Sequence, residues 1–201
     1  MLRTSAAVSA FLLLMATAAQ AAPVFFSADL SGPNESPPNA SPGVGYATVL
    51  FDTTLHSMEV TVTFSGLLGP NTAAHIHCCT AVPGVGTGGV ATSTPTFTGF
   101  PSGTMAGFYD HIFDMTMASS YNPAFLNNAT NGGSTATAEA TLYAGMLAGT
   151  EYLNIHTTVV PGGEIRGFLK VPEPLTLSLF GTGLAGVAAL RRRRQNRNRA
   201  R

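Results

Sequence analysis

The chain has 201 residues, of which 45% are hydrophobic and only 10% are charged, so its length accommodates one ordinary domain plus targeting segments. The formal net charge of zero hides a separation of charge, because most of the basic residues lie from Arg191 onward. Between Pro23 and Val171 there are two basic residues and nine acids, which leaves this central span at −7. A surface of that sign repels phosphate backbones, which argues against nucleic-acid binding by the central domain.

Residues 1–22 have the features of a secretory signal peptide. Arg3 gives a positive start, residues 6–18 form an apolar stretch, and residues 19–21 (Ala-Gln-Ala) have the small-x-small form that signal peptidase accepts. A buried N-terminal helix, the alternative, does not account for that cleavage pattern. We therefore expect export through the general secretory route into an oxidising compartment.

Alternating apolar and polar residues predict short β-strands through the central domain, residues 23–171. The clearest pattern places Val60, Val62 and Phe64 on one face, where we expect them to be buried. The expected strands are, in chain order, 24–30, 45–52, 58–64, 73–79, 104–117, 151–158 and 164–171. The period does not decide between a strand and a short helix for residues 135–143. Many short strands with turn signals between them predict an all-β fold, an antiparallel β-sandwich or Greek-key-like barrel.

Histidines gather on the strand predicted at 73–79. Because side chains alternate across a strand, His75 and His77 share one face. His156 joins them if its own strand is the neighbour, and three imidazoles with an open position are typical of zinc or copper sites. The alternative is that these histidines only bond backbone carbonyls and fix the surrounding loops. We expect the Gly-rich loop at 80–103 to cover them, since loops of this length are usually functional or disordered.

Cys78 and Cys79 are the only cysteines of the chain. In an oxidising compartment the pair has three options: a vicinal disulfide, metal ligation, or a cross-link to another chain. We predict the vicinal disulfide, with metal ligation as the second choice.

Glu164 and Arg166 share a strand face and predict a structural ion pair. Arg166 is one of two cations in an acidic domain, so its guanidinium should meet a carboxylate, that of Glu164 or of an aspartate. We expect this pair to hold the last strand against the sheet.

The C-terminus, residues 172–201, has three parts. Pro172-Glu173-Pro174 excludes helix, residues 175–190 are uncharged and mostly apolar, and an arginine-rich tail follows. This combination resembles the PEP-CTERM sorting signal of Gram-negative bacteria. The resemblance implies transient anchoring in the inner membrane through a C-terminal apolar helix. Cleavage by an exosortase and delivery to the cell surface or the extracellular space would follow.

The central domain carries a second resemblance, to the CHRD domain. The motifs that support it are, in chain order, Phe26-x-Ala28-x-Leu30-x-Gly32, Glu35-x-Pro37-Pro38, His75-Ile76-His77, Asn154-Ile155-His156-Thr157 and Pro161-Gly162-Gly163-Glu164-Ile165-Arg166-Gly167. The resemblance implies an extracytoplasmic β domain without an established catalytic activity. We therefore expect a non-enzymatic binding or structural module at the cell surface or in extracellular matrix, with exopolysaccharide or surface proteins as partners. The alternative is a small metalloprotein with copper or zinc on the histidines, for which redox activity is one option.

Overall fold

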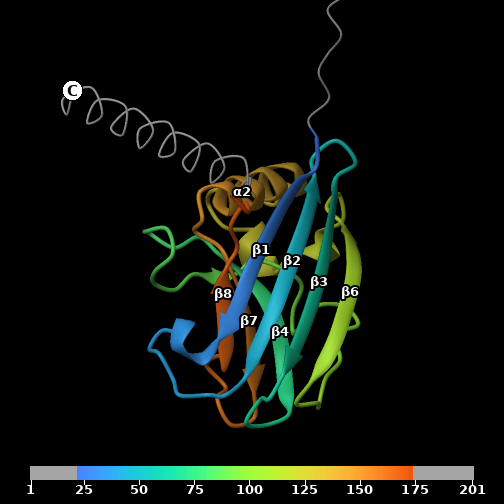
Figure 1. The fold of residues 1–201 in the computed structure, drawn as a ribbon. Helices are drawn as coiled ribbons and strands as arrows, with labels where there is room; N and C mark the ends of the chain where they lie inside the picture. The colour runs from blue at the N-terminus through green and yellow to red at the C-terminus, as the bar shows by residue number, and fades with distance from the viewer. Residues whose placement is uncertain (1–21, 174–201) are drawn as a thin grey trace, which may run out of the picture.

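One antiparallel sheet makes up the body of the protein, in a computed structural model that describes residues 22–173. Its strands are β1 (Val24–Ser31), β2 (Val44–Asp52), β3 (Ser57–Ser65), β4 (Asn71–Cys78), β5 (Gly89–Val90), β6 (Gly107–Asp114), β7 (Tyr152–Thr157) and β8 (Ile165–Phe168). Their order across the sheet is β5-β4-β7-β8-β1-β2-β3-β6. The sheet curls on itself, so that β4 and β7 lie behind β1, β2 and β3 (Figure 1).

The core fills the inside of this curl. Val60, Val62 and Phe64 are almost completely buried, as the period-two pattern predicted. Ile76 of β4 and Leu153 of β7 face them from the other wall, also buried. The predicted all-β antiparallel fold is therefore confirmed, and its form is a half-barrel made from one curled sheet.

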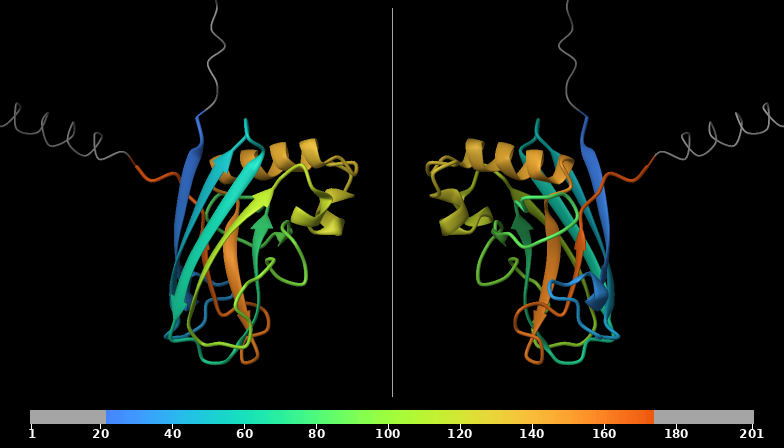
Figure 2. Two further views of the ribbon diagram at one scale, coloured as in Figure 1. Left: turned by 90° about the vertical axis from the view of Figure 1, so that its right-hand side faces the viewer. Right: turned by 90° about the vertical axis from the view of Figure 1, so that its left-hand side faces the viewer.

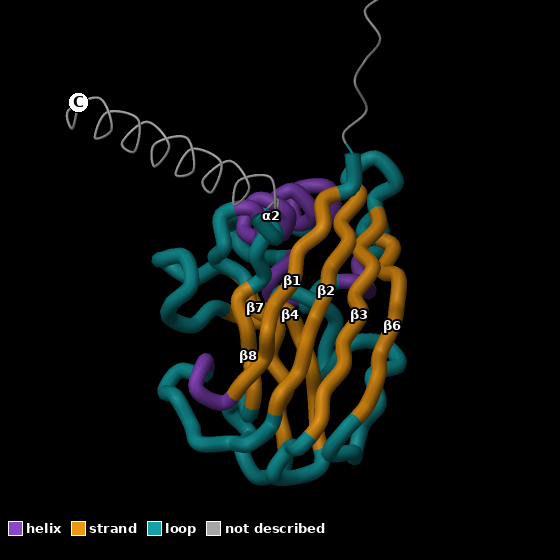
Figure 3. The backbone as a smooth tube through the Cα atoms, viewed as in Figure 1, coloured by secondary structure: helices purple, strands orange, loops and turns teal. Residues whose placement is uncertain are grey.

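A helix closes one end of the half-barrel. The segment that the sequence left undecided forms α2 (Thr135–Leu147), whose first turn is capped by the Ser134 side chain accepting a hydrogen bond from Thr137 N. Figure 2 shows α2 lying across the end of the sheet. The remaining helical pieces are short: η1 (Gly32–Asn34), η2 (Ala118–Ser120) and α1 (Pro123–Leu126). Figure 3 shows that the strands form the body and that loops join them at both ends.

The loop that follows Cys79 packs along the outer edge of β4. Ala91 N donates to Ile76 O at 2.9 Å, and Phe97 N donates to Ala74 O at 3.0 Å. The Phe97 ring is buried and stacks on Tyr109 of β6, with ring centroids 5.7 Å apart. The loop thereby fills the open side of the curl between β4 and β6.

The described chain begins and ends at the same end of the molecule, next to α2 (Figure 1). Ser27 and Lys170 exchange two backbone hydrogen bonds of 2.9 and 3.0 Å, which join the first strand to the segment after β8. No helix within residues 22–173 is long and apolar enough to cross a membrane. The predicted signal peptide, except residue 22, and the predicted apolar helix and basic tail lie outside the described residues.

Candidate metal-binding site

The outer face of β4 and β7 carries the three histidines of interest. On β4, Ala74 and Ile76 point into the core, so His75 and His77 point outward. The antiparallel register sets His75 opposite Asn154 and Ala73 opposite His156, which makes His156 a diagonal neighbour of His75. The two strands are neighbours, and the three rings share one face.

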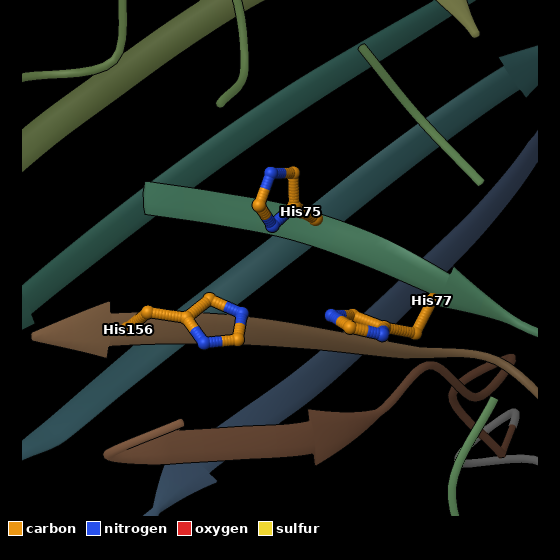
Figure 4. A group of neighbouring side chains, drawn as sticks. All are labelled: His75, His77 and His156. Carbon is orange, nitrogen blue, oxygen red and sulfur yellow. The ribbon is translucent and has the colours of Figure 1, made fainter. Parts of the chain in front are cut away.

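The three rings form a compact cluster. Ring centroids are 5.5 Å apart for His75 and His156, 5.8 Å for His77 and His156, and 5.9 Å for His75 and His77. One nitrogen from each ring lies within 4.8 Å of the other two. Figure 4 shows the rings of His77 and His156 pointing toward each other, with the ring of His75 beside the space between them.

The outward nitrogen of each ring is held by a backbone carbonyl. The hydrogen bonds join His75 Nε2 to Pro95 O at 2.7 Å, His77 Nδ1 to Gly88 O at 3.0 Å, and His156 Nδ1 to Pro161 O at 2.9 Å. A carbonyl only accepts, so each of these ring nitrogens carries the hydrogen. Two of the three carbonyls come from the loop after Cys79, which covers the histidines as predicted.

The inward nitrogens are buried and unpaired. His75 Nδ1, His77 Nε2 and His156 Nε2 have no hydrogen-bond partner among the residues that the structure describes. Burial lowers the pKa of all three rings, and that of His77 falls to about 4. The rings are therefore neutral at pH 7, and each directs a lone pair into the cluster.

Aromatic and cationic groups border the cluster on one side. Tyr152 stacks on His77 with centroids 4.8 Å apart, and the Arg166 guanidinium lies 4.7 Å from the centre of the Tyr152 ring. The positive charge of Arg166 adds a further small depression of the His77 pKa, after those from burial and from the other two histidines.

The predicted ion pair between Glu164 and Arg166 is wrong, because Arg166 pairs with Glu35. Arg166 Nε lies 3.7 Å from Glu35 Oε2, and it donates to Asn34 O at 2.6 Å. Residues 31–43 lie between two predicted strands, and nothing in their sequence indicated that this connection returns an acid to β8. Burial raises the pKa of Glu35 to about 7, although Arg166 acts in the opposite direction.

Glu164 instead joins two loops and the end of β7. Its carboxylate accepts hydrogen bonds of 2.6 Å from Ser41 Oγ, Thr157 Oγ1 and Leu68 N. Glu164 precedes the first residue of β8, and its side chain turns toward these neighbours. These hydrogen bonds tie Glu164 to its neighbours, and Arg166 is not among the partners.

The cysteines lie apart from the histidine cluster. Cys78 points to the core and Cys79 follows the end of β4, and the structure joins them as a vicinal disulfide. Their nearest acid is Glu151, whose Oε1 lies 3.9 Å from Cys79 Sγ. Sequence reasoning missed Glu151. The available signal was the position of this acid, directly before Tyr152 and Leu153 at the start of a predicted strand, where large hydrophobic neighbours indicate burial.

Comparison with known protein families agrees with both resemblances found in the motifs. A family described as the CHRD domain matches residues 26–169, and the PEP-CTERM protein-sorting motif matches residues 170–194. Searches among curated proteins and among solved structures gave no match. The sorting motif makes this an exported protein that an exosortase processes, with a C-terminus anchored transiently in the membrane before the protein reaches the cell surface or the medium. Since the first match covers most of the chain, the protein belongs to the CHRD domain family.

Proposed function

We propose that this exported domain binds one transition-metal ion, copper or zinc, through His75 Nδ1, His77 Nε2 and His156 Nε2. The observation that carries the proposal is that each of the three rings has a buried, unpaired nitrogen, in a cluster where one nitrogen of each ring lies within 4.8 Å of the other two. Leaving a buried polar atom unpaired costs about 1–3 kcal/mol. A metal ion accepts all three lone pairs at once and removes that cost.

The surrounding hydrogen bonds suit a metal site. Histidines that ligate metals usually donate their other ring N–H to a carbonyl or carboxylate, which fixes the tautomer and the ring orientation. All three rings have this arrangement. A purely structural role accounts for the carbonyl-bonded nitrogens and leaves the three inward nitrogens unexplained.

The donor set selects the class of metal. Imidazole nitrogens favour copper and zinc, whereas magnesium and calcium prefer oxygen ligands. At a metal–nitrogen distance of about 2.0–2.1 Å, tetrahedral ligands lie about 3.3 Å apart, so the rings close inward slightly on binding. Three protein ligands leave one position for water or a small molecule.

Metal analysis of the protein purified from the periplasm tests the proposal. We expect one copper or zinc ion per chain, retained through dialysis. His77→Gln should weaken binding by more than the roughly 10–100-fold that loss of an outer-shell partner costs. The matched control is His111→Gln, because His111 lies on β6 between Tyr109 and Phe113 and outside the cluster. A metal-free protein, or equal affinity in the two variants, would contradict the proposal.

A second candidate function, contact with a neutral exopolysaccharide, is supported by the outer face of β1, β2, β3 and β6. Tyr46, Thr63 and Phe108 form one row across this face, with Tyr46 46% and Phe108 63% exposed. Exposed aromatic rings of this kind mark contact surfaces. The acidic domain disfavours an anionic polymer.

Affinity electrophoresis in gels that contain a neutral polysaccharide tests this second function. We expect retardation of the wild type, and normal migration when Tyr46 and Phe108 are both replaced by serine. Removal of metal should leave the retardation unchanged, which separates this function from the first. Equal migration of the double variant and the wild type would rule out this face as the binding surface.

A further inference from the structure

A second chemical group lies on the opposite side of β4 from the histidines. His77 points outward, so the next residue, Cys78, points into the core and is only 6% exposed. Cys79 follows the last residue of the strand and is exposed. The disulfide between them therefore has one sulfur on a buried residue and one on an accessible residue.

A buried acid accompanies this disulfide. Glu151 is completely buried, and one of its oxygens and the two sulfurs lie within 4.8 Å of one another. Its other oxygen has no hydrogen-bond partner within residues 22–173. Gly145 of α2 packs directly against the carboxyl, where a Cβ would meet Glu151 Oε1, so the helix excludes solvent from that side.

The burial of Glu151 has no counter-charge to explain it. The two cations within residues 22–173 are Arg166 and Lys170, and the one ion pair that either forms there is the contact of Arg166 with Glu35. Burial alone raises the pKa of Glu151 well above its usual range, which favours the protonated form of the acid. A protonated carboxyl beside a disulfide is a proton source for sulfur.

We propose that the Cys78–Cys79 disulfide is a thiol-exchange site, entered by external thiols at Cys79, in which Glu151 gives its proton to the sulfur of Cys78 as it leaves. A Glu151 oxygen lies within 4.8 Å of both sulfurs, and Oε1 is 3.9 Å from that of Cys79, so it reaches either sulfur. The direction follows from accessibility, because an attacking thiolate reaches the exposed residue and the buried sulfur is the one that leaves. The buried sulfur needs a proton on leaving, since a thiolate in apolar surroundings is unfavourable. This function is separate from metal binding and does not rest on it.

The exchange proceeds in two steps. The sulfur of an external thiolate bonds to Cys79 Sγ, the Cys78–Cys79 bond breaks, and its electron pair stays on Cys78 Sγ, which takes the proton of Glu151. A second external thiolate attacks the reductant's sulfur in the mixed disulfide and releases Cys79. The two thiols lose two electrons and leave as a disulfide. Their two protons, carried by solvent, restore Glu151 and protonate Cys79.

Trapping of the mixed disulfide tests the point of entry on the wild-type protein. The oxidised, metal-stripped protein is treated briefly with glutathione, quenched with acid and mapped by fragment mass spectrometry. We expect glutathione on Cys79. The single-cysteine variants give the matched comparison, and Cys78→Ser should react with Ellman's reagent at least about tenfold faster than Cys79→Ser, with equal rates in urea. Glutathione on Cys78, or equal rates in the folded variants, would overturn the proposal.

The rate of reduction tests the role of Glu151. Glu151→Gln keeps the shape of the side chain but has no acidic proton, so we expect reduction by dithiothreitol at pH 7 to slow by about tenfold or more. The control is Glu139→Gln, which alters another buried acid, on α2, that pairs with His56 rather than with sulfur. Unchanged reduction in Glu151→Gln refutes the assignment. If that variant does not fold, the trapping result on the wild type still decides the point of entry.

Discussion

Each histidine of the cluster uses its two ring nitrogens differently, and burial decides which charge state the ring adopts. Moving a cationic ring from water into the protein costs more free energy than its hydrogen bond to a carbonyl recovers, so the pKa falls. In metal-free protein we expect the His77 ring to titrate at about 4, and His75 and His156 below the usual value of about 6.5. NMR titration of the ring protons measures this. Midpoints at or above 6.5 would show that the rings are not enclosed as described.

The lowered pKa values also set how the metal responds to acid. Protons displace a metal only when they bind the nitrogens that hold it, and burial shifts that protonation to lower pH. We expect the metal to stay bound at pH 6 and to be lost as the pH falls toward 4. Equilibrium dialysis across this range follows the loss. Release centred at pH 6.5 or above would contradict the prediction.

Gly163 is a glycine near the site whose replacement should destabilise the protein. It has φ +129°, and a Cβ there would meet the side chains of Asn154 and Glu35. Gly163→Ala should lower the free energy of unfolding by about 1–3 kcal/mol. The adjacent Gly162 is the control, because a Cβ at that position meets nothing within 4 Å. Urea unfolding of both variants checks this, and equal stabilities would contradict it.

The alternation of side chains along a strand predicted from the sequence alone that His75 and His77 share a face. It did not predict Glu35 or Glu151, because their placement depends on a loop and on a helix packed from elsewhere in the chain. Local alternation fixes the direction of a side chain on a strand, and it carries no information about which distant segment returns to meet it.

Among the elements, β3 is the strand whose packing the sequence predicts best. Phe64 is 4% exposed and its ring stacks on Phe100, with centroids 5.5 Å apart. Phe64→Ala should cost about 3–5 kcal/mol, the usual range for removing a buried phenyl ring. Thr63→Ala, on the exposed face of the same strand, is the control. A loss below about 1 kcal/mol for Phe64→Ala would mean that the strand face is wrongly assigned.

The helix α2 shows where strand patterns stop being informative. Its buried residues Ala138, Leu142 and Met146 are spaced by four, the interval that returns to one face of a helix. Threonines scattered through the same segment favour strands, and they obscured this signal. Packing of that face against the end of the sheet decides the conformation.

For the whole molecule, the sorting motif makes a prediction about processing. Pro172 and Glu173 end the described chain, and Pro174 with the apolar helix lies outside it. Replacing Pro172, Glu173 and Pro174 by alanine should leave full-length protein in the inner membrane, since the motif match includes these residues. Cell fractionation with an antibody to the domain measures this. Normal release of the altered protein would show that the tripeptide is not needed for sorting.

The bridge between Ser27 and Lys170 has a consequence for the orientation of the domain before release. Because both ends of the described chain leave beside α2, the domain is tethered by that end while its C-terminus is still in the bilayer (Figure 1). The turns at residues 66–70 and 158–163 lie at the opposite end of the sheet, which we expect to point away from the lipid (Figure 1). Pro161, whose carbonyl orients His156, belongs to this distal turn. We therefore expect an ion or molecule that diffuses through the periplasm to reach the histidine side of the protein before it reaches the inner membrane.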